Sequence, residues 1–90
     1  MKRVSQTTQF SRDVKRMRKR GKTLGKLQEV VRLLAAGMAL PAERRDHPLI
    51  GQWAPSRDCH VEPDWILIYT AEAESLRLER CGTHADLFRK

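Results

Sequence analysis

The sequence has 90 residues and a formal net charge of +7, with 18 Lys and Arg side chains against 11 Asp and Glu. A chain of this size forms one domain and buries only about two thirds of its unfolded surface. We therefore expect a single domain over residues 1–90, with room for one small sheet and two or three helices. A dinucleotide-binding fold is excluded.

The positive charge is concentrated at the start of the chain. Residues 1–26 carry ten Lys and Arg side chains and a single acid, Asp13, whereas residues 27–90 carry eight basic and ten acidic side chains. Such a basic segment favours a polyanionic partner, because each neutralised phosphate releases counterions. A solvated helix face is the plainer alternative, but the density of charge favours nucleic acid.

Cysteine content and hydropathy predict the compartment. Cys59 and Cys81 are too few for a disulfide framework and lack the spacing of a metal site. No hydrophobic signal segment follows Met1, and no apolar run approaches the ~20 residues that span a bilayer. We expect a cytoplasmic protein without a membrane partner, in which both thiols are reduced and structural.

The first half of the chain predicts a helical hairpin. Residues 2–6 suit a short edge strand, and Thr7 or Thr8 can cap the helix that follows. That helix ends near Gly21, and a second helix ends before Pro41. Each helix has one apolar face at helical spacing: Phe10, Val14 and Met17 in the first, and Leu27, Val30, Val31, Leu34 and Met38 in the second.

The second half of the chain changes to the period of strands. Three segments have alternating or continuously apolar patterns, and turn-forming residues separate them. A loop precedes these strands, and a helical turn follows them. The loop is expected over residues 42–57, the strands over 57–62, 65–69 and 75–81, and the helical turn over 85–88.

Together these elements predict an α+β fold. The helical hairpin should pack on one face of a small twisted antiparallel sheet, and a short helical turn should close the chain. The strand at residues 65–69 is apolar throughout, so it suits a central position buried on both faces. The face away from the hairpin should be at least partly open, because no further long helix is available to cover it.

A group of acids, imidazoles and a guanidinium lies in this second half. Asp58 and His60 share one face of the first predicted strand with Glu62, and Asp64 follows at the turn. Arg80 is in phase with Leu76 and Leu78, which is unusual for a guanidinium unless it faces a site. The alternation therefore predicts polar chemistry on or near one sheet face.

These residue types match the parts needed to cleave RNA through its own 2′-hydroxyl. A base removes the 2′ proton, a cation stabilises the pentacoordinate phosphorane, and an acid protonates the leaving 5′ oxygen. Histidine suits either proton transfer, and arginine suits the phosphate. An aromatic ring can stack on an unpaired base; the candidates are Trp53, Trp65 and Phe88.

Each candidate also has a structural interpretation. A histidine is more often a hydrogen-bonded surface residue than a catalyst, Asp64 suits a turn, and Arg80 could pair with Glu62 or Glu79. Three histidines with Asp58 and Asp64 could also bind zinc, but none has the tight spacing of a zinc pair. No metal and no cofactor are expected.

Longer motifs carry a resemblance to a known family. The stretches DHPL at residues 46–49, RDCHVEPDWILIY at 57–69 and LERCGTHADLF at 78–88, with Gly51 and Trp53 between the first two, resemble the YafQ branch of the RelE/ParE toxin superfamily. The segment FSRDVK at residues 10–15 is similar to the first helix of that family. The resemblance covers nearly the whole chain.

The resemblance implies a type II toxin that enters the ribosomal A site and cuts mRNA. It implies acid, base and positioning roles for several residues, a phosphate-stabilising role for Arg80, and ribosomal RNA binding by the basic first helix. His84 is the favoured proton-transfer residue, and the general acid and general base remain unassigned. The implied acid, base and positioning set is His47, Asp58, His60, Asp64 and His84; Trp65 and Phe88 would support the site or contact the mRNA; Arg12, Lys15, Arg16 and Lys19 would contact ribosomal RNA.

The resemblance also implies partners. A cognate, DinJ-like antitoxin with an acidic segment should cover the basic surface, and such segments often fold on binding. Operator DNA would be reached only through the antitoxin. Two alternatives stay open: a member of the superfamily that inhibits gyrase without cutting RNA, and a basic nucleic-acid-binding module in which the histidines have no role.

Overall fold

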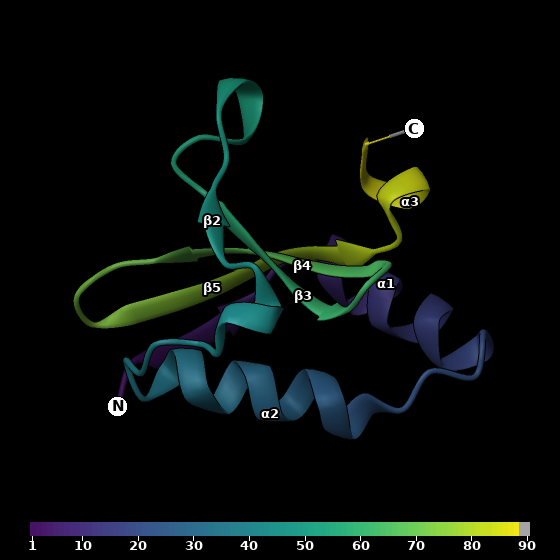
Figure 1. The fold of residues 1–90 in the computed structure, drawn as a ribbon, viewed down its shortest axis with the longest axis horizontal. Helices are drawn as coiled ribbons and strands as arrows, with labels where there is room; N and C mark the ends of the chain where they lie inside the picture. Colours follow the sequence, from purple (N-terminus) through teal and green to yellow (C-terminus); the bar gives the residue numbers. More distant parts are fainter. Residues whose placement is uncertain (89–90) are drawn as a thin grey trace.

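The computed structural model describes residues 1–88, which fold into three helices, two short 3₁₀ turns and a five-stranded sheet (Figure 1). The elements in chain order are β1 (Arg3–Gln6), α1 (Thr8–Lys19), α2 (Leu24–Ala35), η1 (Ala42–Arg44), β2 (His47–Pro48), η2 (Gly51–Trp53), β3 (Arg57–Glu62), β4 (Trp65–Ala71), β5 (Ser75–Gly82) and α3 (His84–Phe88).

The helical hairpin forms as its sequence predicts, with an earlier end to the second helix. Thr7 caps α1, because its side-chain oxygen accepts a 2.9 Å hydrogen bond from the Phe10 amide. Helix α2 ends at Ala35, and Gly37 takes up the left-handed conformation (φ 74°) just beyond it. Met38 was expected on the apolar stripe, but it lies past this end and is 56% exposed.

The sheet has the strand order β1-β5-β4-β3-β2. Strands β3, β4 and β5 form the predicted antiparallel meander, and β2 extends it at one edge. At the other edge β1 pairs with β5 in parallel, so the sheet is mixed. The chain therefore has the α+β fold predicted from its sequence, with one parallel pair contributed by the N-terminal strand.

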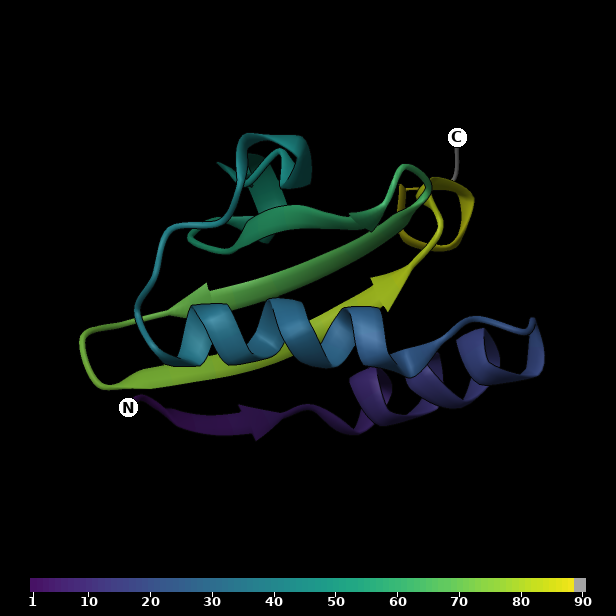
Figure 2. The same ribbon diagram turned by 60° about the horizontal axis from the view of Figure 1, so that its bottom comes forward.

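The two sheet faces are covered to different extents. Helices α1 and α2 lie together on one face, where they bury the main core (Figure 2). On the other face, α3 and the segment around Trp53 bury a much smaller cluster. The central position predicted for β4 is confirmed, because alternate side chains of this strand enter both clusters: Trp65, Leu67 and Tyr69 in the first, and Ile66 and Ile68 in the second.

Two irregularities in strand pairing change which face later residues occupy. One lies between His60 and Glu62, and it turns Glu62 away from Asp58 and His60 toward two lysines of the hairpin. The other lies between Ile68 and Tyr69 of β4, where β5 has one extra residue. In each case, two residues on one strand oppose one on its partner, so the inside-outside alternation shifts by one.

Both cysteines are free and buried. Burial raises the pKa of Cys59 to about 12 and that of Cys81 to about 11, so both thiols stay protonated at neutral pH. Within residues 1–88, no helix has the length and apolar character required to cross a membrane.

Candidate active site

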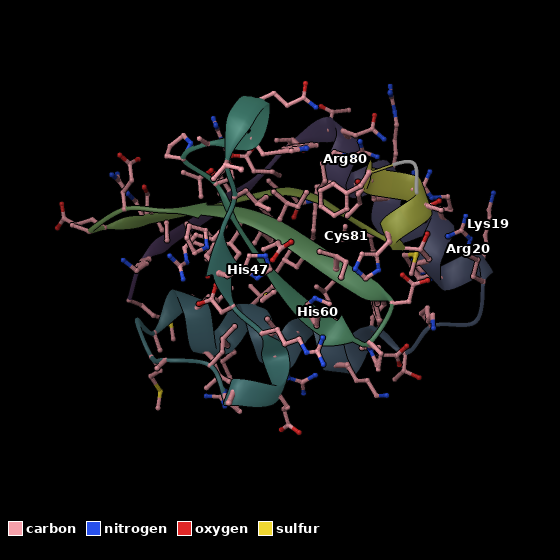
Figure 3. The ribbon with its side chains drawn as sticks, turned by 45° about the horizontal axis from the view of Figure 1, so that its top comes forward. Lys19, Arg20, His47, His60, Arg80 and Cys81 are labelled. Carbon is pink, nitrogen blue, oxygen red and sulfur yellow. The ribbon has the colours of Figure 1, made fainter. Side chains whose placement is uncertain are left out.

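The sheet face opposite the helical hairpin brings together five of the polar residues singled out from the sequence. His47 comes from β2, Asp58 and His60 come from β3, Asp64 lies in the turn after β3, and His84 begins α3. Figure 3 brings this face forward and shows His47 and His60 along it. Segments almost 40 residues apart thus meet on one surface.

His47 lies beside a buried carboxylate. His47 and Asp58 are register partners in the β2–β3 pair, and His47 Nδ1 is 3.0 Å from Asp58 Oδ1. The same nitrogen lies 2.8 Å from the Arg45 carbonyl oxygen, which can only accept, so Nδ1 carries the hydrogen and directs it to Arg45. Asp58 Oδ1 is consequently buried without a hydrogen-bond partner in the described part of the chain.

The environment of Asp58 favours its protonated form. Its side chain is only 7% exposed, and this burial raises its pKa above the ordinary value. The positive charges that His47, His60 and His84 can carry oppose the shift, in that order of strength. All three histidines therefore act electrostatically on this one carboxyl group.

His84 is held at two points by Asp64. Asp64 Oδ1 accepts a 2.6 Å hydrogen bond from His84 Nδ1 and a 2.9 Å hydrogen bond from the His84 backbone amide. These bonds, the backbone bond first, lower the pKa of Asp64. A carboxylate on Nδ1 fixes the tautomer of the ring and leaves Nε2 as the nitrogen that can exchange a proton with a ligand.

The third histidine follows the same pattern. His60 Nδ1 donates to the Pro63 carbonyl oxygen at 3.1 Å, so its Nε2 is also left for a ligand. The His60 and His84 rings lie close together, with centroids 5.6 Å apart. All three imidazoles are thus anchored through Nδ1, by a backbone carbonyl or by a carboxylate.

A row of aromatic rings continues from this pair. The Phe88 ring lies 6.3 Å from His84 and 6.5 Å from Trp53, which it meets edge-to-face. Phe88 is half-buried, so part of its ring can contact a ligand. Trp65 is completely buried in the main core beneath the sheet, which leaves it a supporting role and excludes direct contact with RNA in this conformation.

Arg80 reaches this face because of the extra residue in β5. The sequence placed it in phase with Leu76 and Leu78, which is wrong: both leucines enter the main core, whereas Arg80 pairs with Ile68 on the opposite face. Neither acid suggested from the sequence pairs with Arg80. Its guanidinium instead binds Asp13 of α1, at 2.8 Å from Nε and 3.1 Å from Nη2.

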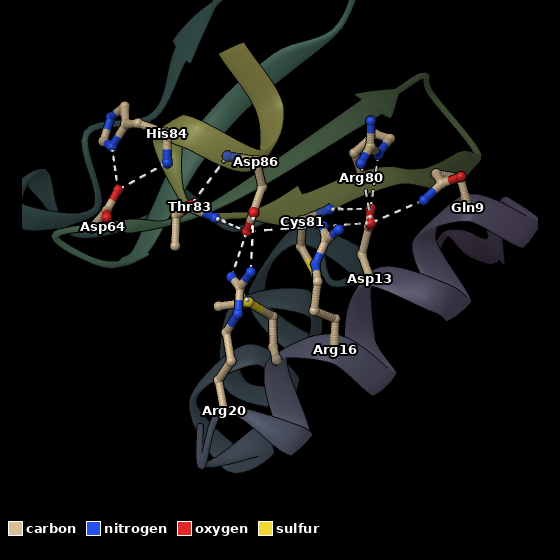
Figure 4. A network of polar contacts seen from close by, with 11 residues as sticks. Gln9, Asp13, Arg16, Arg20, Asp64, Arg80, Cys81, Thr83, His84 and Asp86 are labelled. Atoms are coloured by element: carbon tan, nitrogen blue, oxygen red, sulfur yellow. Dashed lines mark hydrogen bonds and ion pairs between the residues drawn. The ribbon is translucent and has the colours of Figure 1, made fainter. Parts of the chain in front are cut away.

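The basic residues of α1 divide into two groups. Arg12, Lys15 and Lys19 are exposed, as expected of residues that contact RNA. Arg16 was expected to join them, but its guanidinium turns inward, 3.0 Å from Asp13 and 3.9 Å from Asp86 (Figure 4). It is the innermost member of that set.

Sequence reasoning missed the two acids that organise this region, Asp13 and Asp86. Asp86 accepts two hydrogen bonds from Arg20, which, together with Thr83, hold its pKa well below the ordinary value against the opposing effect of burial. Asp13 had a detectable signal. It stands three residues after Phe10 and four before Met17, on the apolar stripe itself, where an acid must find partners inside the fold.

A hollow of about 410 Å³ opens beside His60. Lys26, Arg44 and Arg45 line it, together with Glu43, the end of β3 and Pro63. Glu62 also lies in its wall, but Lys22 and Lys26 neutralise its carboxylate at 2.7 and 2.8 Å. Across residues 1–88 no group of three His, Cys, Asp or Glu side chains is arranged to hold a metal ion.

Comparison with known proteins identifies relatives over almost the full chain. Residues 2–89 match the YafQ family, described as bacterial toxins of type II toxin–antitoxin systems. The mRNA interferase toxin YafQ of Escherichia coli K12 is 50% identical over 86 residues, which cover 94% of each chain. The fold superposes on a chain of the E. coli DinJ–YafQ complex with a TM-score of 0.91, at 48% identity, covering 98% and 99% of the two chains. A copper-bound mutant toxin from Helicobacter pylori gives a TM-score of 0.92 at 33% identity, covering 98% and 100%.

Proposed function

The chain belongs to the YafQ family of bacterial type II toxin–antitoxin toxins, and we propose that it is an endoribonuclease that cuts mRNA in the ribosomal A site. The observation that carries the proposal is the group of three histidines anchored through Nδ1 around one buried carboxyl group. Imidazoles held in this tautomer are suited to take up and deliver protons at neutral pH.

The proposed reaction uses the 2′-hydroxyl of the mRNA as its nucleophile. A general base takes the 2′ proton, the 2′ oxygen attacks the adjacent phosphorus, and the 5′ oxygen leaves with a proton from a general acid. The products are a 2′,3′-cyclic phosphate and a 5′-hydroxyl end. Two proton-transfer groups and one cation suffice, so the reaction needs no metal ion.

The side chains supply these parts in the following way. His84, oriented by Asp64, is the proton-transfer residue that we consider first, and His60 lies close enough to be its counterpart. Asp58 and His47 form a second proton-holding pair beside them. Arg80 would stabilise the charge that develops on the phosphate, because its fork matches two phosphate oxygens.

The remaining surfaces would position the substrate. Phe88 would stack on an unpaired base, and the basic hollow beside His60 would hold the neighbouring backbone. The exposed cations Arg12, Lys15 and Lys19 would dock on ribosomal RNA. A DinJ-like antitoxin would neutralise this cationic surface with an acidic segment and would connect the toxin to its operator DNA, all in the cytoplasm.

The test is cleavage of a defined mRNA on purified ribosomes, with cut sites mapped by primer extension. We expect cleavage by parent protein that has been dialysed against EDTA before it is added to the ribosomes, and its loss in His84→Ala and Arg80→Ala variants that keep the parent's Tm. Parent-like cleavage by both variants would refute the catalytic assignment. Inhibition of gyrase without any cut mRNA would instead support the non-cleaving alternative.

A further inference from the structure

Asp13 is the most completely enclosed acid among the described residues. Its side chain is 0% exposed, although it belongs to the most basic segment of the chain. Five donor atoms from four residues converge on it (Figure 4). They are Arg80 Nε at 2.8 Å and Nη2 at 3.1 Å, Arg16 Nη2 at 3.0 Å, Gln9 Nε2 at 3.2 Å and the Cys81 backbone amide at 3.1 Å.

The carboxylate occupies a gap at the edge of the sheet. Pairing between β1 and β5 stops at Gln6 and Leu78, and Thr7 extends it by one step through hydrogen bonds to the Leu78 and Glu79 carbonyls. Beyond that point, within residues 1–88, no strand pairs with this edge of β5, while its other edge stays paired with β4. Asp13 Oδ2 then accepts a hydrogen bond from the Cys81 amide, so a side chain of α1 provides the acceptor that β1 would provide if it continued.

The same contact fixes the guanidinium of Arg80. Two of its nitrogens, Nε and Nη2, bind the two carboxylate oxygens side by side, which sets both the position and the plane of the fork. The hydrogen bonds that Arg80 donates to Asp13 also raise the pKa of Arg80. Within residues 1–88, Nη1 makes no hydrogen bond, and the side chain is 24% exposed. One edge of the fork is held inside the fold and the other is left for a ligand.

We propose that Asp13 is a positioning residue for the reaction, which it serves by holding Arg80 at the place where phosphate charge develops; this rests on the proposed function. An unrestrained arginine loses rotamer freedom when it binds phosphate. Because Asp13 orders the Arg80 side chain when the protein folds, no further rotamer freedom of Arg80 is lost when RNA binds. Asp13 itself touches no substrate, since it is fully enclosed.

The test is a double-mutant cycle in the ribosome cleavage assay, with Asp13→Asn, Arg80→Ala and the two combined. Asn keeps the shape and one acceptor oxygen, but it lacks the second acceptor and the charge that hold the fork. We expect Asp13→Asn to lower the maximal rate about 100-fold, the cost of a displacement near 1 Å in a catalytic group. The half-saturating toxin concentration and the shape of the pH profile should stay as in the parent.

Coupling distinguishes positioning from general stabilisation. If Asp13 acts through Arg80, the double variant cuts no more slowly than Arg80→Ala alone. If the rate of the double variant is instead lowered by the product of the two single-variant factors, the inference is overturned. Val30→Ala is the matched control, because Val30 is fully buried in α2 and its apolar side chain forms no hydrogen bond in this network; it should lower the Tm and leave the rate unchanged.

Two further outcomes separate this inference from the proposed function. Parent-like cleavage by Arg80→Ala would refute the role of Arg80 and the inference with it, whereas an inactive Arg80→Ala beside a normal Asp13→Asn would overturn the inference alone. If Asp13→Asn does not fold, the inference is tested instead by the order parameter of the Arg80 Nε–H bond, measured by NMR relaxation in the parent protein. An order parameter near the rigid value of about 0.85 supports the inference, and one below about 0.6 overturns it.

Discussion

Replacing Asp64 with alanine should separate catalysis from stability. Asp64 Oδ1 holds both the ring and the backbone amide of His84, at 2.6 and 2.9 Å. The two side chains are 65% and 47% exposed, so their ion pair has the small weight of a surface pair. We therefore expect the Tm of Asp64→Ala to stay close to that of the parent.

The catalytic effect should be larger than the effect on stability. When His84 takes up a proton, the bond to Asp64 becomes a hydrogen bond between charged groups, which contributes about 1.5–3 kcal/mol. Losing it in the transition state corresponds to a rate lower by about 10- to 150-fold. Asp64→Asn keeps the acceptor oxygen without its charge, so its rate should lie between those of Asp64→Ala and the parent.

The assay is mRNA cleavage on purified ribosomes, measured with toxin in excess and well below the Tm of each variant. ¹⁵N shifts of the His84 ring report the tautomer independently of activity. The parent should carry its hydrogen on Nδ1, and Asp64→Ala should lose this preference. Parent-like cleavage by Asp64→Ala, or a tautomer that does not change, would contradict the proposed role of Asp64.

Four other changes test separate parts of the structure. Asp86→Asn should lower the Tm at pH 7 by a few degrees. The hydrogen bonds from its arginine partner depress the pKa of Asp86, so the ionised carboxylate stabilises the fold fully above its unfolded-state pKa. The difference in Tm between the variant and the parent should therefore vanish as the pH falls toward the folded-state pKa. Phe88→Ala should weaken cleavage about 5- to 150-fold, the equivalent of 1–3 kcal/mol of base stacking, while Phe88→Trp should retain it. The double variant Lys15→Glu, Lys19→Glu should bind ribosomes more weakly in a co-sedimentation assay. The slope of the logarithm of its binding constant against the logarithm of the salt concentration should fall by about two, and the cleavage rate on saturating ribosomes should stay intact. Trp65→Ala should cost about 3–5 kcal/mol in chemical denaturation, so its loss of activity would follow unfolding.

Local periodicity predicted most of the framework. The strand expected over residues 57–62 has the bounds of β3, and the apolar run beginning at Trp65 marks the central strand. The Thr7 cap was also predictable, because capping depends on a hydroxyl directly before an amphipathic segment. These signals are contained in short windows of sequence, so they need no knowledge of the tertiary fold.

The errors come from features that leave no trace in such windows. An extra residue in a strand does not interrupt the alternation of the sequence, and it misplaced both Glu62 and Arg80. Strand β2 spans two residues, too short for any periodicity, so the pairing of His47 with Asp58 could not be foreseen from pattern. By pattern His47 was only one of three candidate histidines, and its place in the catalytic set came from the family resemblance.

The small cluster on the site face has a consequence for how the molecule loses activity. Its buried members are Ile66, Ile68 and Leu87, and Leu87 is the only one that α3 supplies. A five-residue helix with one buried side chain, held otherwise by the Asp86–Arg20 pair and half-buried Phe88, belongs to the low end of local stability in a protein. We expect α3, and His84 with it, to open well before the helix-covered side of the sheet unfolds. Heat should therefore inactivate the protein at a temperature where its circular dichroism is still native, and cooling should restore it.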